Sequence, residues 1–214
     1  MSASGARSLV WVRHGRTTAN ASGLLLGRAD PPLDELGRVQ ATAVAAAIRS
    51  GRFGPVLAVV SSPLDRARRT AEAIGAPVQV DERLIELDYG ELDGTPVADV
   101  PGELWAEWRA DIGFRPPGGE SLEELGRRVH EACAEWSERV DRPGAIVLVS
   151  HVSPIKAALS WALSVGDDVA WRSHLDPASI TRILLRGGGR ALGLFNETAH
   201  LEGVPADREE SPPA

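Results

Sequence analysis

Short runs of apolar residues alternate along this chain with longer segments in which apolar positions recur every three or four residues. A compact apolar run is typical of a buried strand, and the three-to-four spacing is typical of an amphipathic helix. The runs that predict strands are residues 9–12, 56–60, 78–80 and 145–149. The spaced patterns predict helices at residues 34–50, 64–74, 121 to about 140 and 154–164. Because strands alternate with helices, we expect an α/β fold, a three-layer α/β/α sandwich around a mainly parallel central sheet.

The ends of these elements carry their own signals. Asp34 is a favourable N-cap residue, and Ser121 with Glu124 forms a capping box at the start of the long helix. Near the carboxyl end, the apolar segments 180–185 and 191–195 flank three consecutive glycines, which predicts a hairpin.

The chain reads as one folded domain, residues 1–201, with an inserted cap. Between about residues 87 and 120 the periodicity weakens while Gly, Pro and aromatic residues accumulate, so we expect loops and short helices that cover the sheet. Residues 21–33 are expected to form a loop. The polar, proline-bearing tail, residues 202–214, is expected to be disordered.

Composition narrows the class of protein. The 214 residues have a formal net charge of -7, which argues against a general nucleic-acid binder or a protein of anionic membranes, since both need a basic face. No apolar run is long enough to span a bilayer, and residues 1–7 do not resemble a signal peptide. A single cysteine, Cys133, excludes an internal disulfide and fits the cytoplasm. It lies on the apolar face of its helix, so a core position is expected. A monomer or a homodimer is compatible with these features.

Polar residues follow three of the predicted strands. Arg13 and His14 follow the first strand, Ser150 and His151 follow the strand at 145–149, and Arg66 lies on the first turn of the helix after the second strand. Ligands of open α/β sheets bind at the carboxyl ends of the strands. Arginine grips phosphoryl oxygens bidentately, and helix N-termini add N–H donors. The convergence of these groups therefore predicts a phosphate site.

Five blocks in order resemble the signatures of the histidine phosphatase superfamily, the phosphoglycerate-mutase-like fold. They are Arg13-His14-Gly15-Arg16-Thr17, the block from Ser61 to Ala71, Leu84 to Gly90 with Asp93-Gly94, Pro117 to Ser121, and Val149-Ser150-His151. The resemblance covers roughly the whole folded chain. It implies a phosphomonoester hydrolase that works through a phosphohistidine on a small phosphorylated metabolite.

The resemblance also implies a role for each matching residue. His14 would be the nucleophile, and Arg13, Arg66 and His151 would hold the phosphoryl oxygens. Glu86 would act as the general acid and then as the base. No metal and no cofactor is implied, because arginine and histidine supply the positive charge.

Further residues are expected around this centre. Thr17 and Asn20 would lie at the pocket edge as donors. Arg28 is either a substrate contact or a solvated loop residue, and Arg16 either adds charge to the rim or is solvated. Asp88, and after it Glu82, remain alternatives to Glu86 as the acid.

The cap bears on the reaction and the substrate. Trp105, Trp108 and Phe114 either wall the substrate pocket or hold the cap down, and packing is expected for at least one of them. A cap whose only arginines are Arg109 and Arg115 offers little to bind a second phosphate, which favours a phosphatase over a cofactor-dependent phosphoglycerate-type mutase. A phospho-ligand binding protein without turnover is the non-enzymatic alternative. The tryptophans suggest a substrate with an apolar or planar part, such as a sugar or nucleotide-like phosphate.

Overall fold

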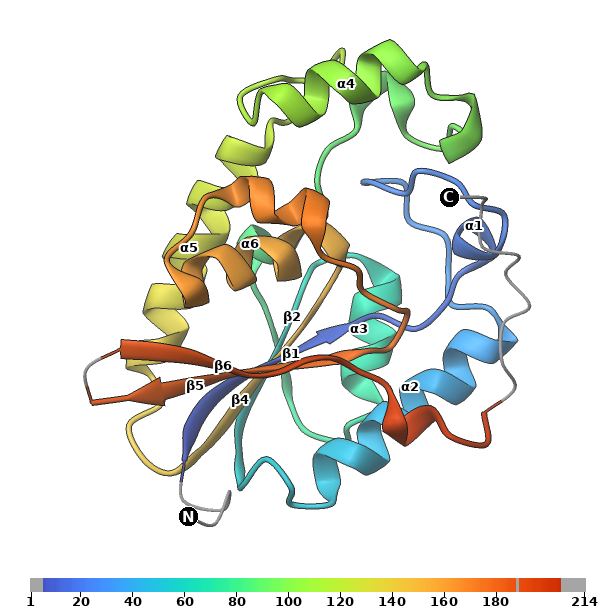
Figure 1. Cartoon of the computed structure of the whole chain (residues 1–214). Helices are drawn as coiled ribbons and strands as arrows, with labels where there is room; N and C mark the ends of the chain where they lie inside the picture. Colours follow the sequence, from blue (N-terminus) through green and yellow to red (C-terminus); the bar gives the residue numbers. More distant parts are fainter. Residues whose placement is uncertain (1–5, 188, 205–214) are drawn as a thin grey trace.

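A computed structural model describes residues 6–187 and 189–204 of the chain, and it has the predicted α/β architecture (Figure 1). The strands are β1 (Arg7–Arg13), β2 (Val56–Ser61), β3 (Val78–Val80), β4 (Gly144–Ser150), β5 (Ile180–Arg186) and β6 (Gly189–Glu197). The α-helices are α1 (Thr18–Ala21), α2 (Glu35–Arg49), α3 (Asp65–Glu72), α4 (Gly102–Ala110), α5 (Leu122–Glu138) and α6 (Val152–Leu163). The 3-10 helices are η2 (Glu82–Leu84), η3 (Gly90–Leu92), η4 (Val97–Asp99), η5 (Asp167–Arg172) and η6 (Ala199–Leu201).

All of these strands join one sheet in the order β3-β2-β4-β1-β5-β6. The pairs β3–β2, β2–β4 and β4–β1 are parallel, whereas β5 runs antiparallel to β1 and to β6. The mainly parallel sheet is therefore confirmed, and the predicted terminal hairpin supplies its antiparallel edge.

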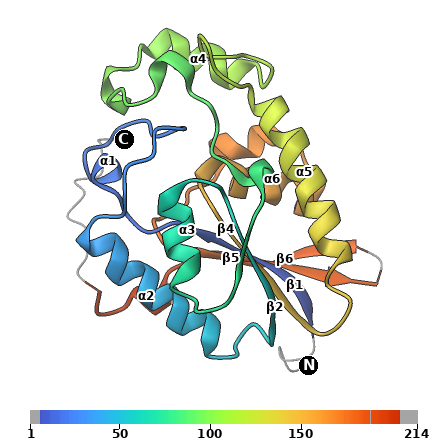
Figure 2. The same ribbon diagram turned by 180° about the vertical axis from the view of Figure 1, so that it is seen from behind.

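Two layers of helices cover the sheet, α2 and α3 on one face and α5 and α6 on the other (Figures 1 and 2). The alternation of side chains along β1 divides the core, because successive residues of a strand point to opposite faces. Leu9 and Trp11 pack with the α5–α6 layer, whereas Val10 and Val12 pack with the α2–α3 layer. Both faces of β1 are thus buried, which explains why its sequence is a continuous apolar run.

The predicted helix starts are present. The Asp34 side chain accepts a hydrogen bond from the Gly37 backbone nitrogen at 2.7 Å, and Ser121 and Glu124 form the reciprocal capping box. The helix predicted at 64–74 is shorter, since α3 ends at Glu72. Its continuation tightens into a turn in which the amides of Ile74 and Gly75 bond carbonyls three residues back.

The segment predicted as a cap, residues 87–120, contains α4, η3 and η4. Figure 1 shows α4 above the upper end of the sheet. One short helix was not foreseen: α1 lies within 18–21, where a Thr17–Asn20 capping box starts it at the entrance of the predicted loop. Of the tail, residues 202–204 follow η6 as a turn, and residues 205–214, on which the prediction of disorder mainly falls, lie outside the described residues.

Cys133 is fully buried in the α5 layer, as its position on the apolar stripe predicts. Among the residues with described structure, no helix is long and apolar enough to cross a membrane.

Candidate active site

The register of two neighbouring strands brings the two predicted histidines together. Arg13 of β1 lies opposite Ser150 of β4, and the His14 amide donates to the Ser150 carbonyl at 3.0 Å. His14 and His151 are the next residues on their strands, and their ring centroids are 5.0 Å apart with the planes tilted by 60°. Parallel pairing in register therefore places both imidazoles at the same edge of the sheet, far apart in sequence though they are.

The orientation of His14 leaves one ring nitrogen for chemistry. Its Nδ1 lies 2.7 Å from the Gly15 carbonyl oxygen, and because a carbonyl only accepts, we assign the proton to Nδ1. Nε2 then carries the lone pair. Burial lowers the pKa of His14 well below its usual range, and the nearby Arg66 and Arg13 lower it further. The ring is therefore neutral at physiological pH.

Gly15 lies where the loop after β1 passes close to the start of α2. A Cβ on Gly15 would lie 2.4 Å from the Gly37 carbonyl oxygen of α2. The glycine is required because two backbones pass in contact, which holds the loop after β1 against the start of α2.

Arg66 is fully buried at the centre of the site. Its Nε donates to His151 Nδ1 at 3.3 Å, while Nη1 and Nη2 donate to the carbonyls of Ala29 and Gly27, both at 2.7 Å. Nη1 also lies 3.5 Å from Asp30 Oδ1. Since a guanidinium carries five N–H groups, these contacts leave an N–H of Nη2 for an anion. The carbonyls that orient Arg66 belong to the 21–33 loop, and the sequence carried no signal for this contact.

His151 is held from both sides. Arg66 donates to its Nδ1, and its Nε2 lies 2.7 Å from the Ser62 hydroxyl, which also accepts from the Leu64 amide. Burial and the neighbouring Arg66 lower the pKa of His151 well below its usual range. The protein groups alone thus favour a neutral ring, whereas the family resemblance implies that histidine contributes positive charge. Binding of a dianion would shift the pKa upward.

Arg13, the residue directly before His14, is half-buried. Its Nη1 donates to the Leu175 carbonyl at 2.6 Å, and its charge contributes to the lowered pKa of both histidines. Arg13 and Arg66 therefore have the same effect, because the positive charge of each disfavours protonation of His14.

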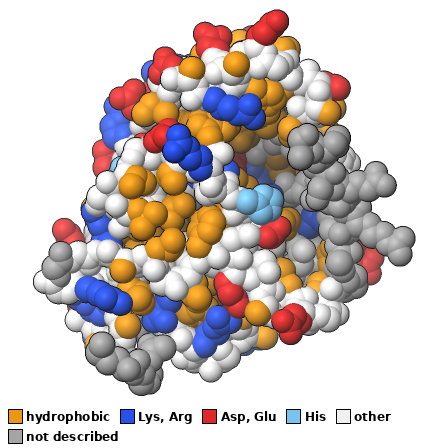
Figure 3. All heavy atoms as spheres, viewed as in Figure 1, with side chains coloured by type: hydrophobic (Ala, Val, Ile, Leu, Met, Phe, Trp, Pro, Cys, Tyr) orange, Lys and Arg blue, Asp and Glu red, His pale blue; other side chains and the backbone are white. Residues whose placement is uncertain are grey.

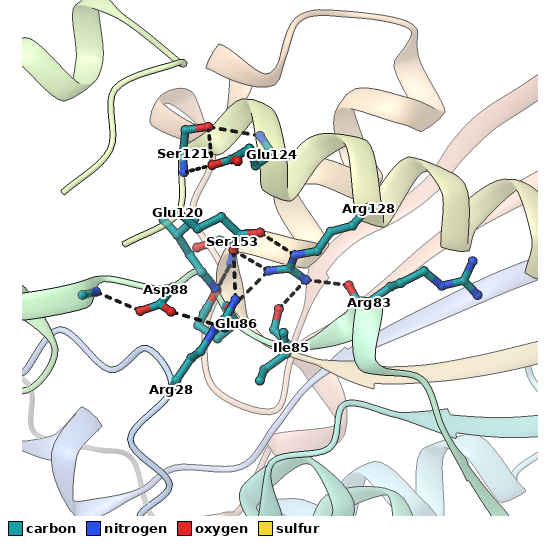
Figure 4. Close-up of polar contacts among 12 residues, drawn as sticks. Arg28, Arg83, Ile85, Glu86, Asp88, Glu120, Ser121, Glu124, Arg128 and Ser153 are labelled. Carbon is teal, nitrogen blue, oxygen red and sulfur yellow. Dashed lines mark hydrogen bonds and ion pairs between the residues drawn. The ribbon is translucent and has the colours of Figure 1, made fainter. Parts of the chain in front are cut away.

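Glu86 is buried, with an exposed fraction of 3 %, and its carboxylate faces the start of α6 (Figure 4). Oε1 accepts from the amides of Leu87 at 2.7 Å and Ser153 at 3.2 Å. Burial raises the pKa of Glu86, and this outweighs the hydrogen bonds and the charge of Arg66, which lower it. Burial therefore shifts both Glu86 and His14 toward their uncharged forms.

Arg128 of α5 anchors the backbone that carries Glu86 (Figure 4). Its guanidinium donates to the carbonyls of Arg83 at 2.6 Å, Ile85 at 2.7 Å and Glu86 at 3.2 Å. It also forms a fork with Glu120, Nε to Oε1 at 2.7 Å and Nη2 to Oε2 at 2.8 Å. Sequence reasoning missed this residue. The only signal was an arginine bordering the apolar stripe of α5, a position at which most arginines are solvated.

The alternative acids have other contacts. Asp88 accepts from the Gly90 amide at 2.9 Å and lies 3.2 Å from Arg28, and it is only half-buried. Glu82 is exposed at the start of η2. Burial and orientation therefore favour Glu86.

The two arginines left open also have acidic partners. Arg28 bridges Asp88 and Glu120, the latter at 3.6 Å, and thereby joins the 21–33 loop to the cap. Arg16 Nε lies 2.7 Å from Asp34, at the start of α2. These ion pairs give Arg28 and Arg16 each a structural role at the edge of the site.

Thr17 and Asn20 bind each other in the capping box of α1. Asn20 Oδ1 accepts from the Thr17 amide at 3.1 Å and from its hydroxyl at 2.9 Å, and Thr17 Oγ1 accepts from the Asn20 amide at 3.2 Å. The Asn20 side-chain NH2 group makes no hydrogen bond to a residue that the structure describes.

A pocket of about 190 Å³ lies beneath the cap, and Leu87 and Ser153, whose amides donate to the Glu86 carboxylate, belong to its wall. The aromatic part of the wall consists of Tyr89, Trp105, Trp108 and Trp171. Trp105 stacks on Trp108 with centroids 5.6 Å apart, and Trp108 is fully buried. The tryptophans of the cap thus both pack and wall a pocket, whereas Phe114 packs against Trp108 at 6.0 Å.

A wider hollow of about 500 Å³ lies elsewhere, between α5, α6 and the β5–β6 hairpin, and holds none of the predicted site residues. Within residues 6–187 and 189–204 there is no group of three or more His, Cys, Asp and Glu side chains placed to hold a metal ion.

Comparison with known proteins places this geometry in a family. The family model of the histidine phosphatase superfamily (branch 1) matches residues 9–198. The chain is 39% identical over 202 residues to a bifunctional protein of Mycobacterium tuberculosis, a match that covers 90% of this chain and 54% of that protein. It therefore spans about half the length of this curated relative. It is also 33% identical over 209 residues to a Yersinia pestis protein named "Probable phosphoglycerate mutase GpmB", covering 91% of this chain and 94% of the relative.

Solved structures show the same relationship. A mycobacterial glucosyl-3-phosphoglycerate phosphatase superposes with a TM-score of 0.77 at 32% identity, covering 90% of this chain and 100% of that one. A phosphoserine phosphatase of Entamoeba histolytica superposes with a TM-score of 0.82 at 26% identity, covering 91% and 99%. The order of the motifs, the fold and the family match agree, and the chain belongs to the histidine phosphatase superfamily.

Proposed function

We propose that this protein hydrolyses phosphomonoesters of small metabolites through a phosphohistidine intermediate at His14. The observation that carries the proposal is that burial in one site acts oppositely on two groups. It lowers the pKa of His14 and raises the pKa of Glu86. A nucleophilic imidazole must be neutral and a general acid must be protonated, so both pKa shifts act toward the states that the reaction requires.

In the first step, Nε2 of His14 attacks phosphorus. The N–P bond forms as the ester P–O bond breaks, and the Glu86 proton passes to the departing alkoxide oxygen. Arg13, Arg66 and His151 surround the transferred group and neutralise its oxygens. Gly15 keeps the His14 proton on Nδ1, so the ring attacks through the correct nitrogen.

In the second step, water attacks the phosphohistidine. Glu86, now a carboxylate, takes a proton from the water as the O–P bond forms and the N–P bond breaks. The amide of Ser153 at the start of α6 donates to this carboxylate and stabilises its charge during this half of the cycle. The cycle returns Glu86 to its protonated form and releases inorganic phosphate.

The proposed reaction requires no metal ion, because its positive charge comes from Arg13 and Arg66. The aromatic pocket beside Glu86 is the proposed site of the leaving alcohol, since the acid must reach the alcohol oxygen. Its aromatic walls support a substrate with an apolar or planar part. Its volume of about 190 Å³ is below the range of about 300–1,000 Å³ that ligand pockets usually have, which supports a single ring or a short carbon chain.

A phosphoglycerate-type mutase is the second candidate, because a relative of this chain carries that name. A mutase needs cations for a second phosphate. The cap arginines are engaged otherwise, Arg115 with Glu124 at 2.6 Å and Arg109 over the rings of Trp105 and Trp171. These contacts support hydrolysis.

The test is hydrolysis of p-nitrophenyl phosphate in EDTA by the wild type, His14→Ala and Glu86→Gln. His174→Ala is a matched control, because the His174 side chain is 81% exposed. We expect loss of turnover in His14→Ala, a marked decrease in Glu86→Gln and none in the control. An acid-labile phosphoenzyme should form only where His14 is present.

A parallel assay with phosphoglycerate and bisphosphoglycerate separates the alternatives. Mutase turnover that exceeds hydrolysis would replace the proposal with the second candidate. Phosphate binding with neither turnover nor phosphoenzyme would indicate a binding protein, and activity lost in EDTA and restored by a divalent cation would overturn the metal-free mechanism.

A further inference from the structure

The aromatic pocket of about 190 Å³, which is the proposed site of the leaving alcohol, contains the only lysine of the chain, Lys156. It lies on the inner side of α6, one turn after Ser153, whose amide binds Glu86. The side chain is half-buried, and its Nζ donates to the Ala170 carbonyl of η5 at 2.7 Å. An ammonium group carries three N–H donors, so this bond leaves donors for a ligand.

No carboxylate of the described residues lies within 4.0 Å of Nζ. Every ion pair among the described residues joins an arginine or a histidine to an acidic residue, and none includes Lys156. A lysine removed from water is ordinarily paired, because a lone buried charge is costly. Burial lowers the pKa of Lys156, while the nearby Glu86 acts in the opposite direction. The cation thus lies in the pocket wall without an anion against it.

The wall around Lys156 is mostly apolar and aromatic, and it includes Leu87, Leu122, Val152, Trp105, Trp108 and Trp171. The indole Nε1–H groups of Trp108 and Trp171 are buried and have no hydrogen-bond partner among the described residues. Because these indole nitrogens are shielded from the open space of the pocket, Lys156 is the cationic donor that a ligand in the pocket would meet. Figure 3 shows hydrophobic side chains below the cap on this face, together with Lys and Arg side chains.

We propose that Lys156 binds a carboxylate of the leaving alcohol, so that this site selects phosphomonoesters of small hydroxy acids. The carbon skeleton would lie on the tryptophan faces while the ester oxygen meets Glu86. This inference rests on the proposed phosphatase function and deepens it, since it names the chemical class of the alcohol.

The test uses two esters of equal shape, 4-carboxyphenyl phosphate and 4-carbamoylphenyl phosphate, which differ in one negative charge. The quantity measured is the ratio of their kcat/KM values in the wild type, Lys156→Met and Lys156→Arg. Comparing the ratio between variants cancels the intrinsic reactivity of the two leaving groups. It also cancels loss of the Ala170 hydrogen bond, which would affect both esters alike.

We expect the wild type to prefer the carboxylate about tenfold or more, since hydrogen bonds to charged groups are about twice as strong as neutral ones. The ratio should fall about tenfold in Lys156→Met and recover in Lys156→Arg. Arg172→Met removes a positive charge from the same region and is the control, because its side chain is 81% exposed.

A ratio that is the same in the wild type and Lys156→Met overturns the inference. If the variants do not fold, inhibition of the wild type by 4-hydroxybenzoate and by 4-hydroxybenzamide decides, and equal inhibition overturns it. His14→Ala with both esters separates the two proposals. Turnover that persists without His14 contradicts the phosphohistidine mechanism, whereas turnover that requires His14 with an unchanged ratio contradicts only the role of Lys156.

Discussion

His14 and His151 extend from adjacent parallel strands, and their ring centroids lie 5.0 Å apart. Both side chains are buried and therefore shielded from water. Two imidazoles at this separation cannot both be protonated without repulsion, and Arg66 and Arg13 add to the cost. The same arrangement that keeps His14 nucleophilic therefore also makes the folded protein sensitive to acid.

Stability should decrease as the pH falls through about 6.5, the value at which histidines of the unfolded chain take up protons. The folded-state pKa values of His14 and His151 lie well below this, so the unfolded chain binds more protons in that range. Each histidine contributes a slope of at most about 1.4 kcal/mol per pH unit. Urea unfolding in phosphate-free buffer between pH 7.5 and 5.5 measures the slope.

The control for this prediction is the double variant His14→Gln, His151→Gln. Its free energy of unfolding should depend less on pH over the same range, because neither glutamine titrates. An equal slope in the double variant and the wild type would show that other groups cause the acid sensitivity.

Glu86→Gln should lose activity and gain stability at alkaline pH. The folded protein holds the Glu86 proton to a higher pH than the unfolded chain, so stability declines as pH rises through the folded-state pKa. Glutamine does not ionise and avoids this decline. Turnover should fall about 10²–10⁴-fold, the usual contribution of a general acid. Thermal unfolding at pH 5 and pH 8 measures the stability difference, which should be larger at pH 8.

Asp88→Asn is the matched carboxylate variant and should keep most of its turnover, because Asp88 contacts Gly90 and Arg28 outside the proposed reaction path. If the pH dependence of the rate lost the ionisation of the general acid in Asp88→Asn but kept it in Glu86→Gln, Asp88 would be the acid.

Arg128→Lys should impair the proton transfer by Glu86 more than the binding of phosphate. A lysine cannot reproduce the fork with Glu120 and the contacts to three carbonyls, so the Glu86 segment would lose its fixed position. We expect kcat to fall about 100-fold for phenyl phosphate, whose alcohol needs protonation, since small displacements have effects of that size. With p-nitrophenyl phosphate the decrease should be smaller.

Arg127→Lys is the control, because Arg127 is an exposed neighbour on the same helix. An equal decrease for both esters in Arg128→Lys would mean that Arg128 supports the fold in general and does not position the acid.

Cys133 should be unreactive in the folded protein. Its thiol is fully buried, and burial raises the pKa of the thiol, so little thiolate forms. Incubation with a disulfide reagent at pH 8 should label no thiol in the native state and one in denaturant. Rapid labelling of the native protein with loss of activity would contradict this.

A structural feature can be predicted from the sequence when the interactions that produce it join residues close together in the chain. The first strand, predicted at residues 9–12 and observed as Arg7–Arg13, and the capping box at Ser121 were predictable, because apolar runs and caps act within a few residues. Arg128 and Lys156 were not. Each is a polar residue on a helix that would look solvated, and only the packing of α5 and α6 against distant segments brings them to the acid segment and the pocket.

The sequence by itself determined the alternation of strands and helices and placed Arg13, His14 and His151 at strand ends, since these follow from local hydrophobic patterning. The tertiary structure alone decided that β1 and β4 pair in the register that joins the histidines, that carbonyls of a loop orient Arg66, and that burial drives the pKa values of His14 and Glu86 apart. The reason is physical: hydrophobic periodicity is a property of neighbouring residues, whereas desolvation and the contacts between charged groups depend on residues that only folding brings together.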